Sequence, residues 1–307
     1  MELSKRDNVV AWLQLLRLPN VFTAVADVTM GYVITHGELQ PVLHFALLIA
    51  ASCLLYLSGM VLNDVFDAEV DARERPERPI PSGRVSLKAA AAVGWAMLAT
   101  GIALAWLVTF IANDWRPGVV ATLLAACIVL YDVVLKRSRF APLIMGECRF
   151  LNVLLGMSLS IILWERSEVL IAAGVGIYIV GVTMFARMDA HISARSRLLS
   201  GFTVLLAGIA LLAAVPKITG DRPPLEVSFT GWYLLWAALA LITARRCVTA
   251  IFERSPPRVQ AAVRHCVQSI IVLDAAVCVG YASAYWGFAV LVLLVPTLLL
   301  TMWLNST

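Results

Sequence analysis

The sequence predicts an all-α, polytopic membrane protein, and two observations carry this prediction. Of its 307 residues, 61% are apolar and only 14% are charged, whereas soluble domains are rarely more than half apolar. The apolar residues also come in runs of about twenty, the length that a helix needs to cross a bilayer. The repeated alternation of a transmembrane barrel is absent from these runs. We therefore expect a bundle of membrane-spanning helices.

The runs predict nine transmembrane helices plus a tenth, within one membrane domain over residues 1–307. Residues 1–18 are expected to form an amphipathic segment on the membrane surface, because Val9, Val10 and Trp12 lie near one helical face. No cleavable signal peptide is expected. Ser86 is a predicted N-cap of the third span. The expected spans are residues 21–35, 42–62, 87–112, 119–135, 143–164, 169–185, 198–215, 232–247, 263–285 and 288–304.

The six cysteines do not form a recognisable metal or disulfide pattern. They are scattered through the apolar runs or at their ends, no C-x-x-C pair occurs, and the four histidines are scattered as well. This distribution favours buried free thiols over a zinc site or a disulfide framework.

The most informative stretch follows the second span, where an apolar helix ends in acidic residues. Asn63, Asp67 and Asp71 recur at every fourth position, and Asp64 joins them on one helical face. Carboxylates this close repel one another unless a cation neutralises them, and their hard oxygens suit Mg²⁺. Arginines that can grip phosphate follow at positions 73, 75, 78 and 84. The pattern favours a magnesium-diphosphate site over the alternative, a solvated cap on a membrane helix.

The whole pattern, N-D-x-x-D-x-x-x-D followed by R-P-x-P-S-G, resembles the UbiA superfamily of intramembrane prenyltransferases, and its wording is closest to the EboC-like branch. The resemblance implies a UbiA-like bundle of nine helices, so the tenth is an extension. It also implies Mg²⁺-dependent transfer of a prenyl group from an isoprenyl diphosphate donor to a small aromatic or hydroxylated acceptor within the membrane. The implied metal ligands are Asn63, Asp64, Asp67 and Asp71, and the implied catalytic residues are Asp67, Asp71 and Lys136.

Two further segments extend this resemblance. The fourth span ends in Y-D-V-V-L-K-R, which places Lys136 and Arg137 where the family holds diphosphate, although positive-inside anchoring alone would explain two basic residues. After the sixth span the family has a second acidic motif. Here Asp189 is kept as a further metal ligand, but Ser193 stands four residues on, so the motif is degenerate and a second Mg²⁺ is in doubt. The diphosphate contacts expected are Arg73, Arg78, Lys136, Arg137 and Arg187.

Polar residues inside the predicted spans mark a cavity or a buried pair, because charge in lipid is costly. Asp27 lies in the first span. In the fifth, Arg149 and Asn152 share a helical face, whereas Glu147 and Arg149, two residues apart, do not. Asp27, Arg149 and Asn152 are therefore candidates for an acceptor pocket, with a purely structural pairing as the open alternative.

The basic residues predict the orientation. With the amino end in the cytosol, most of the 24 Lys and Arg residues fall in cytosolic segments. The exceptions are Arg149, within a span, and the outer-loop residues Arg116, Arg166, Lys217 and Arg222. Such an excess on one side sets the topology of helical membrane proteins. We expect a multi-pass protein of a bacterial inner membrane whose active site faces the cytosol.

Three other functions were weighed. A non-catalytic membrane component that binds or transports an isoprenoid or metabolite is favoured by the degenerate second motif and opposed by the intact first one. A CDP-alcohol phosphatidyltransferase would need a D-G-x-x-A-R element, which is missing. A repeat-built transporter would show two matching halves with broken helices, which the sequence does not show. No nucleic-acid partner is expected.

Overall fold

The computed structural model describes residues 2–161, 163–187, 195–220 and 228–306, and these ranges contain helices and no strands. The α-helices are α1 (Glu2–Leu15), α2 (Val21–His36), α3 (Val42–Phe66), α4 (Ala68–Glu74), α5 (Leu87–Ala112), α6 (Arg116–Leu130), α7 (Ala141–Gly156), α8 (Arg166–Ala186), α9 (Arg195–Thr219), α10 (Phe229–Glu253), α11 (Pro256–Tyr281), α12 (Ala284–Leu291) and α13 (Leu294–Ser306). A 3₁₀ turn, η1 (Leu18–Asn20), precedes α2, and a π-helical turn, η2 (Tyr131–Leu135), follows α6.

The predicted class, a polytopic helical bundle, is confirmed. Eight helices in the described ranges are long and apolar enough to cross a membrane, and a ninth span results if the segments around residues 7–15 and 18–36, bent by 42°, count as one. Helix α7 has only 16 residues and carries charged side chains, so it falls short of this length although it lies within the bundle. Ser86 caps α5 as predicted, because its hydroxyl accepts from the Ala89 amide at 3.2 Å.

Two predicted spans have different bounds in the structure. The fifth was expected over residues 143–164, but α7 ends at Gly156, where the Ser158 hydroxyl donates to the Leu155 carbonyl at 2.7 Å and competes with helical backbone pairing. The tenth is one candidate span over Ala284–Leu304, which begins earlier than predicted and has a break at residues 292–293 between α12 and α13. Pro296 has no amide proton to donate to the Val292 carbonyl four residues earlier, which accounts for the break. Apolar composition alone does not reveal either break.

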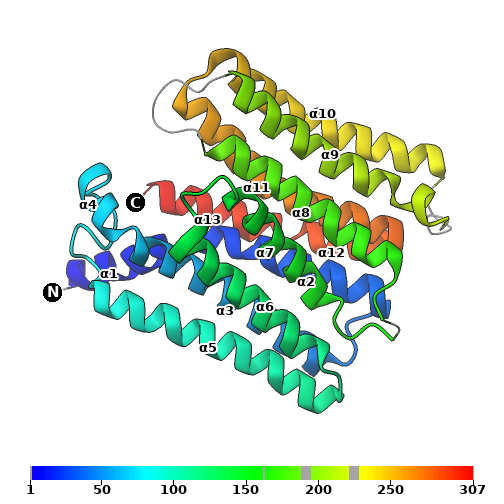
Figure 1. Ribbon diagram of the computed structural model, residues 1–307, viewed down its shortest axis with the longest axis horizontal. Helices are drawn as coiled ribbons and strands as arrows, with labels where there is room; N and C mark the ends of the chain where they lie inside the picture. Colours follow the sequence, from blue (N-terminus) through cyan, green and yellow to red (C-terminus); the bar gives the residue numbers. More distant parts are fainter. Residues whose placement is uncertain (1, 162, 188–194, 221–227, 307) are drawn as a thin grey trace.

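The membrane helices close into a ring. Among the described segments, contacts run in the order α2, α3, α5, α6, α7, α8, α9, α10 and α11, and α11 returns to α2. Figure 1 shows these helices lying along one direction, with α1 and α4 at the same end of the bundle as the α10–α11 connection. Helices α12 and α13 pack on α2 and α11. The ring leaves an interior where residues from distant parts of the chain can meet.

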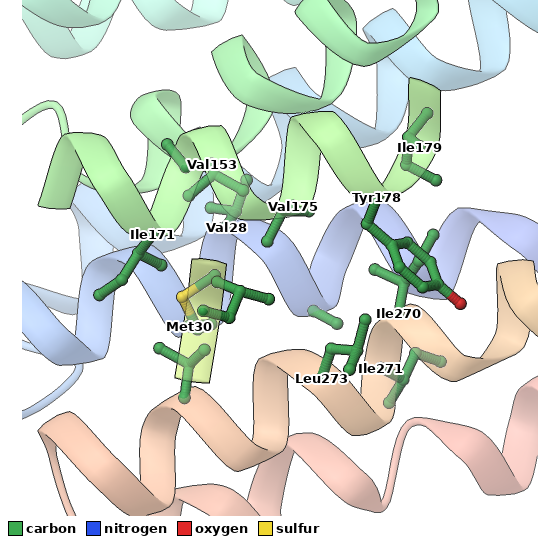
Figure 2. Packing of buried hydrophobic residues seen from close by; sticks show 14 of the residues in the cluster. Val28, Met30, Val153, Ile171, Val175, Tyr178, Ile179, Ile270, Ile271 and Leu273 are labelled. Carbon is green, nitrogen blue, oxygen red and sulfur yellow. The ribbon is translucent and has the colours of Figure 1, made fainter. Parts of the chain in front are cut away.

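Apolar side chains fill the ring where α2, α7, α8 and α11 meet. Figure 2 shows Val28 of α2, Val153 of α7, Val175 and Tyr178 of α8, and Ile270 of α11 directed toward one another. All five are buried. This packing is the rigid part of the molecule against which the polar residues of the same helices are positioned.

Helices α2 and α7 approach each other closely through glycines. A β-carbon at Gly31 would lie 2.7 Å from the Val153 carbonyl oxygen, and one at Gly156 would lie 2.5 Å from that of Val28. Small residues permit such contact between membrane helices. The close crossing brings Asp27 of α2 against Arg149 of α7.

The predicted surface segment, α1, packs on the rest of the protein through part of its apolar face. Val9 is 58% exposed, whereas Ala11 and Leu15 of α1 are buried. They form a second apolar cluster with Ile80, which lies within the R-P-I-P-S-G-R loop, and Val85, which follows it. Helix α1 therefore covers this loop, and the loop is anchored at both ends beside the acidic residues.

Candidate active site

The acidic residues lie at the junction of α3 and α4. Asp67 joins the two helices, and its amide donates to the Asn63 carbonyl at 3.1 Å, while the Asp71 amide donates to the Asp67 carbonyl at 2.8 Å. These four-residue hydrogen bonds continue the helical repeat across the junction, so the predicted grouping of polar side chains is kept. The group spans an arc of roughly 100°, because successive residues are about 100° apart on a helix.

One half of this arc faces the proline-rich loop and the α1–α2 junction. Arg78 Nη1 lies 2.6 Å from Asp71 Oδ2 and 3.5 Å from Asp64 Oδ1. Asp64 Oδ1 also accepts from Arg17 Nη2 at 2.9 Å. Both carboxylates are buried, with 4% exposure for Asp71 and 6% for Asp64. Two arginines from separate segments thus neutralise two carboxylates.

The other half of the arc faces η2. Asn63 Nδ2 donates to Asp132 Oδ1 at 2.9 Å, and the Lys136 ammonium forms an ion pair with Asp67 Oδ2. Each contact joins residues 69 positions apart in the chain. The predicted single acidic face therefore has two sets of partners, one on each side.

The π-helical turn positions Asp132 and Lys136. The Lys136 amide donates to the carbonyl of Tyr131, five residues earlier, at 2.8 Å. A π turn widens the helix by one residue and is frequent at functional sites. The turn places buried Asp132 within hydrogen-bond distance of Asn63 and allows Lys136 to pair with Asp67.

Arg17 adopts an unusual backbone conformation. Its φ and ψ angles of 46° and 44° are left-handed, a region that costs free energy for residues with a β-carbon. The strain persists where surrounding structure fixes it, often at functional sites. In this position the Arg17 side chain contacts Asp64.

The other predicted phosphate contacts lie elsewhere. Arg73 pairs with Glu69 at 2.7 Å on the exposed side of α4, and Arg137 is exposed. Arg187 donates to the carbonyls of Ser138 at 2.6 Å and Lys136 at 3.2 Å, so it holds the loop between η2 and α7. Asp189 and Ser193, the remnants of the second acidic motif, lie outside the described residues.

A cavity of about 320 Å³ opens beside the acidic residues. Arg17, Asn63 and Asp132 line its polar end, and Ser52, Arg149 and Asn152 line another polar part. Most of the remaining wall is apolar and comes from α3, α6, α7, α8 and α11. These apolar lining residues are Met60, Leu124, Ile128, Met145, Ile179, Val182, Ala186, Val263, Val267 and Ile270.

The three candidate acceptor residues form one buried network. Asp27 Oδ2 accepts from Arg149 Nη1 at 2.5 Å and from Asn152 Nδ2 at 2.8 Å. Arg149 also donates to Thr23 at 2.7 Å, and Ser52 donates to Asn152 Oδ1 at 2.6 Å. Arg149 and Asn152 line the cavity, whereas Asp27 is fully buried behind them. Arg149 therefore fits both interpretations that the sequence left open, because it pairs with Asp27 and also lines the cavity.

The carboxylate and amide oxygens at the acidic junction are of the type that binds Mg²⁺. Within the described residues, no group of three or more Asp, Glu, His or Cys side chains is gathered closely enough to hold a metal. Each acidic side chain is paired with a basic one instead. These contacts engage one oxygen each of Asp64, Asp67 and Asp71, so a second hard oxygen of each carboxylate remains available.

Two site residues were not among those predicted. Arg17 was assigned only to the end of the surface segment, and Asp132 was noted without a role. The signals that mark them are a basic residue two positions before a helix-breaking Pro-Asn pair and an acid at the end of an otherwise apolar span. Asp274 of α11 is another buried acid, and neither of its oxygens has a hydrogen-bond partner among the described residues.

All six cysteines are free thiols, as predicted. Cys247 of α10 and Cys266 of α11 lie with their sulfur atoms 3.5 Å apart in a hydrogen-bonded contact.

Comparison with known proteins identifies related sequences. The model of the UbiA prenyltransferase family matches residues 24–263. The digeranylgeranylglyceryl phosphate synthase of Saccharolobus solfataricus is 35% identical over 133 residues, which are 42% of this chain and 44% of that protein. The enzyme of the same name from Methanoculleus marisnigri is 35% identical over 131 residues, which are 43% of this chain and 44% of that protein. The matched part thus spans less than half the length of these relatives.

Solved structures share the fold. A UbiA homolog from Archaeoglobus fulgidus bound to GPP and Mg²⁺ superposes with a TM-score of 0.66 at 13% identity, covering 91% of this chain and 99% of that one. A digeranylgeranylglyceryl phosphate synthase structure gives a TM-score of 0.63 at 21% identity, covering 90% and 99%. At these identities the likeness concerns the arrangement of helices.

Proposed function

Because this chain belongs to the UbiA prenyltransferase family, we propose that it transfers a prenyl group from an isoprenyl diphosphate to a small acceptor within the membrane. One observation carries the proposal: three carboxylates form ion pairs with three basic side chains beside a largely apolar cavity. The carboxylates are those of Asp64, Asp67 and Asp71, and the basic residues are Arg17, Arg78 and Lys136. An isoprenyl diphosphate has the same division, with an anionic head and an apolar tail. The relatives bound to GPP or DMAPP with Mg²⁺ support this donor class.

The acidic junction is the proposed magnesium site. Asn63, Asp64, Asp67 and Asp71 would hold the ion, and Asp189 remains a proposed further ligand outside the described residues. A bound Mg²⁺ would neutralise the diphosphate and assist its departure. The resting ion pairs keep these carboxylates in place without a ligand, because isolated buried carboxylates would be costly.

Basic residues would bind the leaving group. Arg17, Arg78 and Lys136 already point at the acidic junction, and on donor binding they would contact phosphate oxygens, which guanidinium groups bind well. Arg187 supports the Lys136 loop through its carbonyl contacts. Arg73 and Arg137 are exposed, and a phosphate role for them would require both side chains to reorient toward the junction.

The cavity would hold the prenyl tail and the acceptor. Its apolar wall would exclude water from the allylic carbon as the carbon–oxygen bond breaks, which favours capture by the acceptor over hydrolysis. Arg149 is charge-paired with buried Asp27, so the Ser52–Asn152–Arg149 region offers hydrogen bonds with little net charge. This polarity supports an acceptor that presents a hydroxyl group, on an aromatic or aliphatic carbon.

We further propose that this site faces the cytosol of a bacterial cell. The excess of Lys and Arg in the segments at this end of the bundle supports that orientation. The EboC-like branch remains a prediction from the motif wording.

A second candidate is a non-catalytic membrane component that binds an isoprenoid. The observation that favours it is the pairing of each acidic side chain with a basic one, which yields no group of metal ligands among the described residues. Purified protein incubated with radiolabelled prenyl diphosphates and a panel of hydroxylated acceptors, with and without Mg²⁺, separates the two. Mg²⁺-dependent product supports the enzyme, and donor binding without turnover supports the second candidate.

A further inference from the structure

A second polar cavity lies away from the proposed active site. It measures about 270 Å³ and is formed between α10 and α11. Arg245, Arg246 and Thr249 line it from α10, and Arg258, Ala261 and Ala262 line it from α11. Helix α11 separates the two cavities, because its residues Val263, Val267 and Ile270 line the first one.

The second cavity is lined mainly by positive charge. Three arginines line it, and the acidic contact that the described residues provide there is Glu253, which accepts from Arg258 Nε at 2.8 Å. That contact uses the Nε side of the guanidinium and leaves its terminal nitrogens for another acceptor. Like charges held this close favour an anion between them. Thr249 adds a hydroxyl, so the lining provides donors suited to phosphate.

A half-buried histidine lies on the same side of α11 as Ala261. His265 follows Ala261 by one helical turn, and its Nε2 is buried without a hydrogen-bond partner among the described residues. An unsatisfied polar atom inside a protein is uncommon.

The surroundings indicate that the phosphate belongs to a lipid. Leu241, one turn before Arg245 on α10, is 71% exposed, and Leu234, two turns earlier still, is 65% exposed. Helix α10 lies on the outside of the bundle in Figure 1, with its Arg245–Glu253 part toward the end that carries α4. Exposed apolar side chains on the membrane side of a basic pocket can contact the acyl chains of a lipid whose headgroup lies in the pocket. A free anion would make no such apolar contact.

We propose that the cavity between α10 and α11 binds the phosphate headgroup of an anionic glycerophospholipid from the leaflet that faces the proposed active site. Arg245, Arg246 and Arg258 contact the phosphate, and the apolar face of α10 contacts the acyl chains. The site is distinct from the donor site and requires neither Mg²⁺ nor prenyl transfer. Its failure would leave the proposed enzymatic function untouched.

The amount of phosphatidylglycerol that stays bound to the protein tests this proposal directly. The full chain is placed in nanodiscs of phosphatidylcholine containing a minority of phosphatidylglycerol, then released and weighed by native mass spectrometry. The double variant Arg245→Gln/Arg246→Gln should retain phosphatidylglycerol more weakly by about fivefold per arginine. Arg245→Lys/Arg246→Lys, which keeps both charges, should retain more of it than the glutamine variant.

Two controls make the result decisive. Arg264→Gln removes the same charge from α11 at an exposed position that does not line the cavity, and it should retain phosphatidylglycerol like the unmodified chain. Inorganic phosphate added in excess should not displace the lipid. Equal retention by the glutamine double variant, an equal loss in Arg264→Gln, or displacement by inorganic phosphate alone would each overturn the proposal. Thermal unfolding of each variant verifies that the fold is intact.

Discussion

Arg78 Nη1 lies 2.6 Å from Asp71 Oδ2, so the proline-rich loop is tied to α4 by an ion pair in which both side chains are largely buried. In the proposed reaction both groups have other partners, since Arg78 contacts phosphate and Asp71 contacts Mg²⁺. The ion pair therefore preserves the geometry of the site between turnovers. It also means that removing either side chain disturbs the resting site as well as the reaction.

The acidic junction gives the first prediction. Asp67→Asn or Asp71→Asn should lower the turnover number by roughly 100-fold or more, because each removes a carboxylate charge that would help to neutralise the departing diphosphate. The measurement is prenyl transfer at saturating donor and Mg²⁺. Glu69→Gln is the matched control, since Glu69 lies on the same short helix but pairs on the exposed side with Arg73. Near-normal turnover in both Asp variants would refute the metal assignment.

A second prediction separates two neighbouring basic residues. Lys136→Gln should reduce turnover by roughly 100-fold, a typical effect of deleting a charge-stabilising donor, since Lys136 reaches the acidic junction. Arg137→Gln should leave the rate close to normal, because that side chain is exposed. Steady-state kinetics of both variants provides the comparison. If Arg137→Gln lost as much activity as Lys136→Gln, the structure would have assigned the phosphate contact to the wrong residue.

The sequence predicted the class of the fold and the end of the bundle at which the polar motifs gather. Hydrophobic length and the spacing of Asn63, Asp67 and Asp71 are local properties, and local patterns suffice for both. The partners of these residues are not local. Asp132 and Lys136 reach the junction from 69 residues away, through a π-helical turn that no spacing rule reveals. Arg17 contacts Asp64 through a left-handed backbone conformation, which depends on tertiary packing.

The break after α7 was missed for a related reason. Residues 157–164 are apolar enough to continue a span, but the Ser158 hydroxyl competes for the backbone carbonyl of Leu155 there. The Asp27–Arg149 pair, by contrast, could be proposed because unpaired charge inside a membrane is rare, and the structure supplies the partner.

That buried pair gives a third prediction. Arg149→Met should destabilise the protein by about 3–5 kcal/mol, the typical result of leaving one member of a buried ion pair without its partner. Asp27→Asn/Arg149→Met, which removes both charges, should recover part of the loss. Chemical unfolding in detergent measures both. Glu147→Gln, on the exposed side of α7, is the control and should unfold normally. A stable Arg149→Met protein would contradict the structural role of the pair.

The close crossing of α2 and α7 gives a fourth prediction. Gly156→Ala should cost about 1–3 kcal/mol, because the added β-carbon would meet the Val28 carbonyl at 2.5 Å and force the helices apart. Gly59→Ala is the comparison, since its β-carbon would meet only the Ile128 side chain, at 3.3 Å. Thermal unfolding should rank Gly156→Ala well below Gly59→Ala. An equal midpoint for the two would show that this crossing tolerates separation.

The central claim is that the acidic junction captures the donor through a divalent cation. Isothermal titration calorimetry of the purified chain with geranyl diphosphate tests it without requiring an acceptor. We expect binding in the presence of Mg²⁺, little binding after chelation, and loss of the Mg²⁺-dependent component in Asp67→Asn/Asp71→Asn. Equal binding with and without Mg²⁺, unchanged in the double variant, would contradict it.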